Sequence, residues 1–382
     1  MLKRKRNNLL TPTKQKQTVR NTFAELTFYQ KKLLSITEQV TKLSASLCLQ
    51  IIEYVLFLED NFGIMIHWGL YSVPAFDAVE SAKRRNIGNG SEWYHKRLQT
   101  SETDFRPTSG YKETQRYHKN KYGAHHQYSE FMTDFTAKQF SADEWIKKFV
   151  SCNASYVVIT AKHHDGFCLW PTNTTTFSTT HAACATNGHS DIVKSIQQAC
   201  RKYHLKFGIY FSWMEFGKPN TKEFLLNIAK PQLLELMEYQ PDFFWFDGDW
   251  VFKTKETQLV LDDCVKLIRK RLPLVQINDR IGHFAERKAD PNYLGLSTYR
   301  VYEDRFIPVT KPTIAFESAH TIGLSWGVNH QQQEKDYKTA SQLNNLRRRV
   351  LKLGGRFLLN VGPNADGTLD PIEVKRLEQM IL

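Results

Sequence analysis

The sequence has no apolar stretch long enough to cross a lipid bilayer. A membrane-spanning helix needs about 20 consecutive, mostly apolar residues. The richest apolar stretch, residues 43–58, is interrupted by Gln50 and Glu53. We therefore expect no membrane span, and we predict that residues 43–58 form an amphipathic or buried helix.

Several common functional motifs are also missing. The six cysteines form no CxxC pair, which disfavours a zinc ribbon or a thioredoxin-type redox site. No GxSxG nucleophile elbow, Walker phosphate loop or HExxH zinc motif is present. The sequence therefore disfavours an α/β serine hydrolase, a P-loop nucleotide-binding protein and a zincin-type metalloprotease.

Acidic residues are scarce in the first 42 positions, where ten Lys or Arg are opposed only by Glu25 and Glu38. This segment carries a net charge of +8, out of +13 for the whole 382-residue chain. No basic stripe with interleaved aromatic residues follows it, so we expect no nucleic-acid partner. We expect residues 1–42 to be a poorly ordered basic leader and residues 43–382 to be a catalytic domain. The MLKRKR start is basic, but it lacks the apolar region and cleavage site of a secretion signal.

The rest of the chain alternates short apolar runs with segments of helical spacing. The runs are nearly continuous in hydrophobicity, as in parallel strands buried on both faces: residues 62–68, 156–161, 207–212, 243–246, 274–277, 313–316 and 357–361. Helical spacing appears in between, over residues 141–149, 191–203, 231–239, 257–271 and 340–353. This alternation predicts an α/β fold, a TIM-type (β/α) barrel without a C-terminal β-sandwich.

Polar and aromatic residues gather where the predicted strands end. In a TIM barrel, chemistry is located at the C-terminal ends of the strands. Six of these ends carry His, Trp, Tyr, Asp, Arg or Glu side chains: His67, His163, His164, Tyr210, Trp245, Asp247, Arg280 and Glu317. Aromatic rings stack on sugars, His and Arg bind hydroxyls, and paired carboxylates cleave glycosidic bonds. The pattern therefore predicts a glycoside hydrolase that needs no cofactor.

From residue 61 onward, seven or more ordered sequence blocks resemble one known family. The blocks are FGIMIHWGLYSVPAF, EWY, YVVITAKHHDGFCLWPT, KFGIYFSWMEF, PDFFWFDGDW, INDR, SWGVN and FLLNVGPNADG, and YVVITAKHHDGFCLWPT is the most specific of them. They resemble the α-L-fucosidases of glycoside hydrolase family 29. This resemblance implies a retaining enzyme that removes terminal α-L-fucosyl groups from glycans or glycoconjugates. Members of the family act outside the cytosol or in lysosomes, so localisation stays open for a chain without a recognisable signal.

The resemblance also assigns roles to residues. It implies that Asp247 is the nucleophile that forms a covalent glycosyl-enzyme. It implies further that the fucose is bound and enclosed by the following side chains: His67, Trp93, Tyr94, His163, His164, Tyr210, Trp245 and Arg280.

Three carboxylates are candidates for the acid/base. We prefer Glu303, followed by Glu317 and then Asp304, because the family does not keep this residue in one motif. The acid/base must be protonated in the first step, which requires a raised pKa. Retention predicts a distance of roughly 5 to 5.5 Å between it and the nucleophile.

Other functions remain open at this point. A metal-dependent barrel hydrolase with His67, His163, His164 and Asp247 as zinc ligands is one alternative. Neighbouring residues on a strand point to opposite faces, which disfavours joint ligation by His163 and His164. A catalytically impaired carbohydrate-binding barrel is a second alternative, and the same mechanism acting on another sugar is a third.

Overall fold

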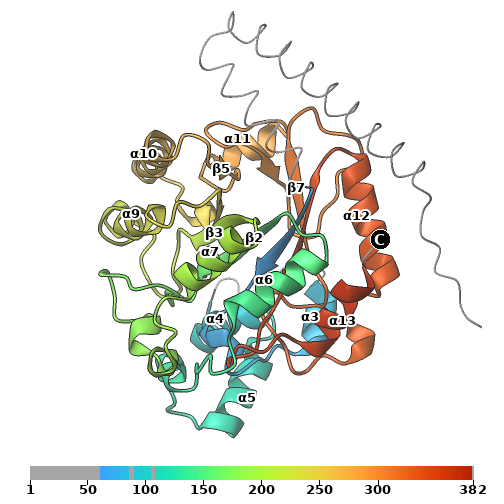
Figure 1. Ribbon diagram of the computed structural model, residues 1–382. Coiled ribbons are helices and arrows are strands. Elements are labelled where there is room, and N and C mark those ends of the chain that lie inside the picture. Colours follow the sequence, from blue (N-terminus) through green and yellow to red (C-terminus); the bar gives the residue numbers. More distant parts are fainter. Residues whose placement is uncertain (1–60, 86–89, 105–107, 381–382) are drawn as a thin grey trace, which may run out of the picture. The chain divides into compact units, whose positions relative to one another are not determined.

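The computed structural model describes residues 61–85, 90–104 and 108–380. Its centre is a sheet of eight parallel strands in the order β5-β4-β3-β2-β1-β8-β7-β6 (Figure 1). The strands are β1 (Phe62–Ile66), β2 (Tyr156–Lys162), β3 (Lys206–Ser212), β4 (Phe243–Asp247), β5 (Gln276–Ile277), β6 (Arg300–Val301), β7 (Phe316–Thr321) and β8 (Arg356–Val361). A parallel bridge between Asn278 and Tyr299 links the segments that follow β5 and precede β6. The predicted TIM-type barrel is therefore confirmed.

Helices connect the strands (Figure 1). They are α3 (Val79–Arg85), α4 (Tyr94–Gln99), α5 (Tyr111–Tyr122), α6 (Ala142–Ser151), α7 (Ile192–Lys202), α8 (Lys222–Phe224), α9 (Lys230–Met237), α10 (Lys255–Arg271), α11 (Phe284–Ala289), α12 (Ala340–Lys352) and α13 (Pro371–Gln379). Helices α6, α7, α9, α10 and α12 confirm the five predicted helical segments. The predicted leader and the predicted helix over residues 43–58 lie outside the described residues.

Side-chain caps fix where several of these helices begin. Ser141 Oγ accepts a hydrogen bond from Glu144 N at the start of α6. Thr339 and Gln342 form a reciprocal capping box at the start of α12. Such caps satisfy backbone N–H groups that have no partner within the helix. None of the helices in the described part of the chain is long and apolar enough to cross a membrane.

One predicted strand is displaced along the chain, and one strand was not predicted. Strand β7 covers Phe316–Thr321, whereas the apolar run predicted a strand over residues 313–316. Its sequence, FESAHT, is mostly polar yet wholly buried, so a rule based on apolar runs does not detect it. Strands β5 and β6 are two residues long each. A strand of two residues is too short to show a hydrophobic pattern, which is why β6 was not predicted.

The core has an outer layer between strands and helices and a smaller cluster inside the barrel. The inner cluster is rich in aromatic rings, including Tyr156, Tyr210, Phe243, Trp245 and Tyr299. These large rings need small neighbours. At Gly63, an added Cβ would lie 2.2 Å from the Tyr156 ring, so no larger residue fits there without movement.

Candidate active site

The C-terminal ends of strands β1 to β4 and the loops after β5, β6 and β7 surround a cavity of about 1020 Å³. Its wall includes the carboxylate of Asp247, the last residue of β4, which is 7% exposed. Parallel strands bring their C-terminal ends to one rim, which explains why residues distant in sequence meet here.

Two donors hold the carboxylate of Asp247. The hydroxyl of Tyr210 donates to Oδ2 at 2.8 Å, and Arg280 Nη1 donates to Oδ1 at 2.8 Å. His164 Nε2 lies 3.5 Å from Oδ2. Burial by itself would raise the pKa of Asp247, but the positive charge of Arg280 and these hydrogen bonds bring the pKa below its usual value. The carboxylate is therefore held ionised and oriented.

Three buried histidines form the wall beside this carboxylate. His67 Nδ1 is hydrogen-bonded to Asn360 Oδ1 at 2.5 Å, and His164 Nδ1 to Ser212 Oγ at 2.6 Å. Burial lowers the pKa of both His67 and His164 to about 4, and it lowers the pKa of His163 well below its usual value. All three rings are therefore neutral near pH 7. A neutral imidazole can both donate and accept, which suits it to binding sugar hydroxyls.

Trp245 forms a platform under the two partners of Asp247. Its ring stacks on Tyr210 with centroids 5.3 Å apart, and the guanidinium of Arg280 lies 4.8 Å from its centroid. The indole N–H donates to Glu317 Oε1 at 2.8 Å. The position of the platform is thus tied to a carboxylate inside the barrel.

Glu317 lies below the cavity rather than in its wall. Tyr156 donates to its Oε2 at 2.7 Å, and Arg356 Nη2 lies 3.3 Å from the same atom. Burial raises the pKa of Glu317, while the nearby charge of Arg356 opposes that shift. Both oxygens of this carboxylate are therefore already occupied by protein donors.

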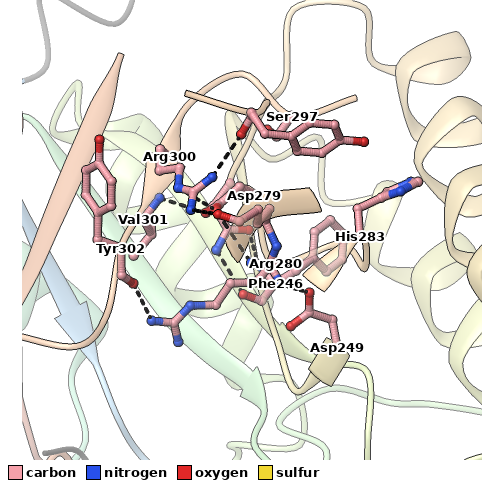
Figure 2. A network of polar contacts seen from close by, with 12 residues as sticks. Phe246, Asp249, Asp279, Arg280, His283, Ser297, Arg300, Val301 and Tyr302 are labelled. Atoms are coloured by element: carbon pink, nitrogen blue, oxygen red, sulfur yellow. Dashed lines mark hydrogen bonds and ion pairs between the residues drawn. The ribbon is translucent and has the colours of Figure 1, made fainter. Parts of the chain in front are cut away.

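A second set of charged residues borders the cavity on the side of β5 and β6 (Figure 2). Val301 N donates to Asp279 Oδ1 at 2.7 Å, and Arg300 Nε lies 3.4 Å from Asp279 Oδ2. Asp249 Oδ2 accepts from Gly282 N at 2.8 Å and from the guanidinium of Arg287. Burial raises the pKa of Asp249 to about 6, although Arg287 opposes the shift. This network fixes the loops that carry Arg280.

Glu92, which also lines the cavity, joins two loops. Its carboxylate accepts from the backbone N–H of Gly90 at 2.5 Å, Trp326 at 3.2 Å and Gly327 at 3.1 Å. The Trp326 ring in turn lies 5.2 Å from the His67 ring. These bonds hold two segments that are more than 230 residues apart in sequence.

A model of the family described as Alpha-L-fucosidase matches residues 37–381 of this chain. The chain belongs to the alpha-L-fucosidase family. This finding confirms the family that the sequence blocks predicted. Its members are glycoside hydrolases.

Relatives of known identity support the assignment to the alpha-L-fucosidase family. Alpha-L-fucosidase of Dictyostelium discoideum is 33% identical over 339 residues, covering 84% of this chain and 67% of that protein. Human tissue alpha-L-fucosidase is 30% identical over 336 residues, covering 84% of this chain and 65% of that protein. The chain thus spans about two thirds of the length of these curated relatives.

Solved structures of alpha-fucosidases have the same fold. The crystal structure of Thermotoga maritima alpha-fucosidase in complex with fucose matches with a TM-score of 0.70 and 29% identity. The match covers 85% of this chain and 72% of that chain. A complex of the same enzyme with a mechanism based inhibitor matches equally well.

Most residues predicted for the fucosidase site come together. The cavity wall contains His67, Trp93, His163, His164, Tyr210, Trp245, Asp247, Arg280 and Glu303, and also Asp304. Tyr94 and Glu317 do not reach it. Tyr94 is fully buried in the outer core, where its hydroxyl is 2.9 Å from His118 Nδ1. The roles of all these residues remain predictions.

Several wall residues were not predicted from the sequence. Trp250 and Trp326 lie inside the blocks that resemble the family, and their rings contact His164 and His67. That proximity to predicted residues in sequence is a signal that could have found them. Phe284 and Arg287 lie on α11 and Phe306 lies in the loop after β6; neither segment carries a motif, and only the fold brings these residues to the cavity.

The metal-hydrolase alternative lacks a ligand set in the part of the chain that is described. No three His, Cys, Asp or Glu side chains there are arranged so that they hold a metal ion. His163 and His164 are neighbours whose ring centroids are 4.2 Å apart, but Asp247 is already bound by Tyr210 and Arg280.

Proposed function

We propose that this chain hydrolyses terminal α-L-fucosyl linkages with retention of configuration, and that Asp247 is the nucleophile. The observation that carries the proposal is the carboxylate of Asp247 in the cavity wall, kept ionised by Arg280 and Tyr210. A nucleophilic carboxylate must be ionised when the substrate binds. The Thermotoga maritima relative was solved with fucose and with a mechanism based inhibitor, which supports the same chemistry for this chain.

We assign the acid/base role to Glu303. Its side chain is exposed at the cavity rim, and its carboxylate has no hydrogen bond or ion pair with any described residue. The other candidates are engaged, since Asp304 Oδ1 accepts from Arg280 Nη2 at 2.6 Å and Glu317 is buried under Trp245. An acid/base must exchange protons with the leaving oxygen and with water, which requires this accessibility.

The reaction then has two steps. In the first, an oxygen of Asp247 attacks the anomeric carbon while Glu303 gives its proton to the leaving oxygen, and the glycosidic C–O bond breaks. In the second, the Glu303 carboxylate takes a proton from a water molecule, which attacks the same carbon and releases Asp247. Neutral His67, His163 and His164 bind the fucose hydroxyls, and Trp245 lies beneath the ring.

The test is hydrolysis of 4-nitrophenyl α-L-fucoside by the wild type and by Asp247→Ala, with and without azide. We expect wild-type turnover, loss of turnover in the variant, and partial rescue by azide with a product of inverted configuration. Undiminished turnover in Asp247→Ala would contradict the nucleophile assignment. Fucose binding without any wild-type turnover would instead support the carbohydrate-binding alternative.

A further inference from the structure

The cavity is larger than one monosaccharide requires. Pockets for drug-sized ligands occupy about 300 to 1000 Å³, and this one, of about 1020 Å³, is at the upper end of that range. The histidines, Trp245 and Asp247 occupy the deep part. The outer part is bordered by residues of α11 and of the loop after β6, to which the proposed function assigns no role apart from Glu303.

Two phenylalanines in this outer part are unusually exposed. Phe284 on α11 is 52% exposed and Phe306 is 40% exposed, and both line the cavity. Large apolar side chains exposed at the mouth of a pocket are characteristic of a binding surface. Aromatic faces bind the apolar faces of pyranose rings, so a sugar is a suitable occupant.

The position of Phe306 relative to Glu303 indicates which part of the substrate it meets. Phe306 N donates to Glu303 O at 3.2 Å, which closes a tight turn with the proposed acid/base at its start. The Phe306 ring contacts Tyr302 edge to face, with centroids 5.7 Å apart. The two rings are therefore on either side of Glu303 in the chain. The oxygen that Glu303 protonates belongs to the leaving group, so these rings lie on the leaving-group side.

Phe284 lies on a helix that the charged network next to β4 anchors. The guanidinium of Arg287 lies 5.9 Å from the Phe284 ring centroid, and Arg287 is paired with Asp249 and Asp279. A ring whose position is fixed before binding loses little conformational entropy when a ligand stacks on it. Phe284 is thus an exposed ring on a helix whose position is fixed by the ion pairs of Arg287.

We propose that Phe284 and Phe306 form a leaving-group subsite that selects fucosides whose leaving group is itself a sugar. The preferred substrate is then a fucosyl oligosaccharide rather than a fucoside with a small leaving group. This inference rests on the proposed function, and it adds two specificity-determining residues outside the fucose pocket.

The test compares two substrates that differ in the leaving group. One is a trisaccharide in which α-L-fucose is joined to lactose, and the other is α-L-fucosyl fluoride, which has no ring to stack. For Phe284→Ala and Phe306→Ala, we expect kcat/KM for the trisaccharide to fall roughly tenfold, the loss of one stacking contact. We expect kcat/KM for the fluoride to stay within about twofold, because its transition state does not contact these rings.

Leu259→Ala is the matched control, since Leu259 is 53% exposed on α10 and does not line the cavity. It should leave both substrates unaffected. Equal losses on both substrates, or no loss on the trisaccharide, would overturn the subsite while leaving the proposed function intact. Absence of wild-type turnover on both substrates would refute the proposed function, and the subsite with it.

Discussion

Trp245 and Glu317 are joined by a hydrogen bond of 2.8 Å from the indole N–H to Oε1, across the top of the barrel interior. Above this bond, the Trp245 ring supports Tyr210 and Arg280, which both bind Asp247. Below it, Glu317 is paired with Arg356. One carboxylate thus links the floor of the site to the interior of the fold.

For this reason we expect Glu317→Gln to lower the stability of the fold, and to affect activity only through that loss. The change removes one partner of a buried ion pair, which costs about 3 to 5 kcal/mol of unfolding free energy when the other charge stays buried. Urea denaturation measures this loss. Addition of Arg356→Met should recover part of it, because the second charge is then gone too. A Glu317→Gln enzyme of full stability but without activity would point instead to a catalytic role.

Arg280 should control the acidic side of the pH profile. Its positive charge helps to keep the pKa of Asp247 below the usual value despite burial. We expect Arg280→Met to raise that pKa, so that the acidic limb of kcat/KM moves to higher pH. Arg280→Lys retains the charge and should move the limb less. An acidic limb at the same pH in all three proteins would contradict this account.

Asp249 should make the protein less stable as the pH rises from about 4 to about 6. Burial raises its pKa to about 6 in the folded state, whereas an unfolded aspartate titrates near 3.9. Between these values the folded state holds a proton that the unfolded state has lost, so stability falls with rising pH by up to about 3 kcal/mol.

Asp249→Asn should flatten this part of the stability profile, as followed by denaturation at a series of pH values. The exposed Asp263 of α10, whose side chain is 71% exposed, provides the control Asp263→Asn. An equally steep profile in Asp249→Asn and wild type would show that another group is responsible.

The cap of α12 should contribute to stability and not to activity. Thr339→Ala removes the hydroxyl that accepts from Gln342 N, which costs about 1 kcal/mol at a typical N-cap. Ser341→Ala, in the same exposed first turn, removes a hydroxyl that caps nothing there. Thermal unfolding should separate the two variants, while their fucosidase rates should be the same. Equal melting temperatures would mean that the cap is unimportant.

Much of the site was predictable because it follows the strand ends. Asp247 ends an apolar strand, and His163 and His164 follow another, so the rule that chemistry lies at the C-terminal ends of barrel strands locates them. The same rule fails for Glu317. The apolar run over residues 313–316 placed Glu317 at the end of a strand, whereas it is the second residue of β7 and lies deep in the barrel.

The unpredicted residues have a common physical origin. Phe284, Arg287 and Phe306 come from connections after β5 and β6, whose strands are two residues long. Neither periodicity nor a motif marks such segments, and their approach to the cavity depends on tertiary ion pairs such as that of Arg287 with Asp249. A sequence pattern indicates local structure. It does not indicate that Arg287, on a distant segment, pairs with the carboxylate of Asp249.

The short strands β5 and β6 have a consequence for how the enzyme loses activity. Their two segments share only one β-bridge among the described residues, between Asn278 and Tyr299, so strand pairing is sparser here than between the other neighbouring strands of the sheet. Arg280 follows β5 and Asp304 follows β6. The ion pair between Arg280 Nη2 and Asp304 Oδ1, at 2.6 Å, links the two segments. Local opening begins where backbone pairing is weakest. We therefore expect that opening of this part of the sheet separates Arg280 from Asp304 and changes the charge around Asp247 while the other six strands remain folded.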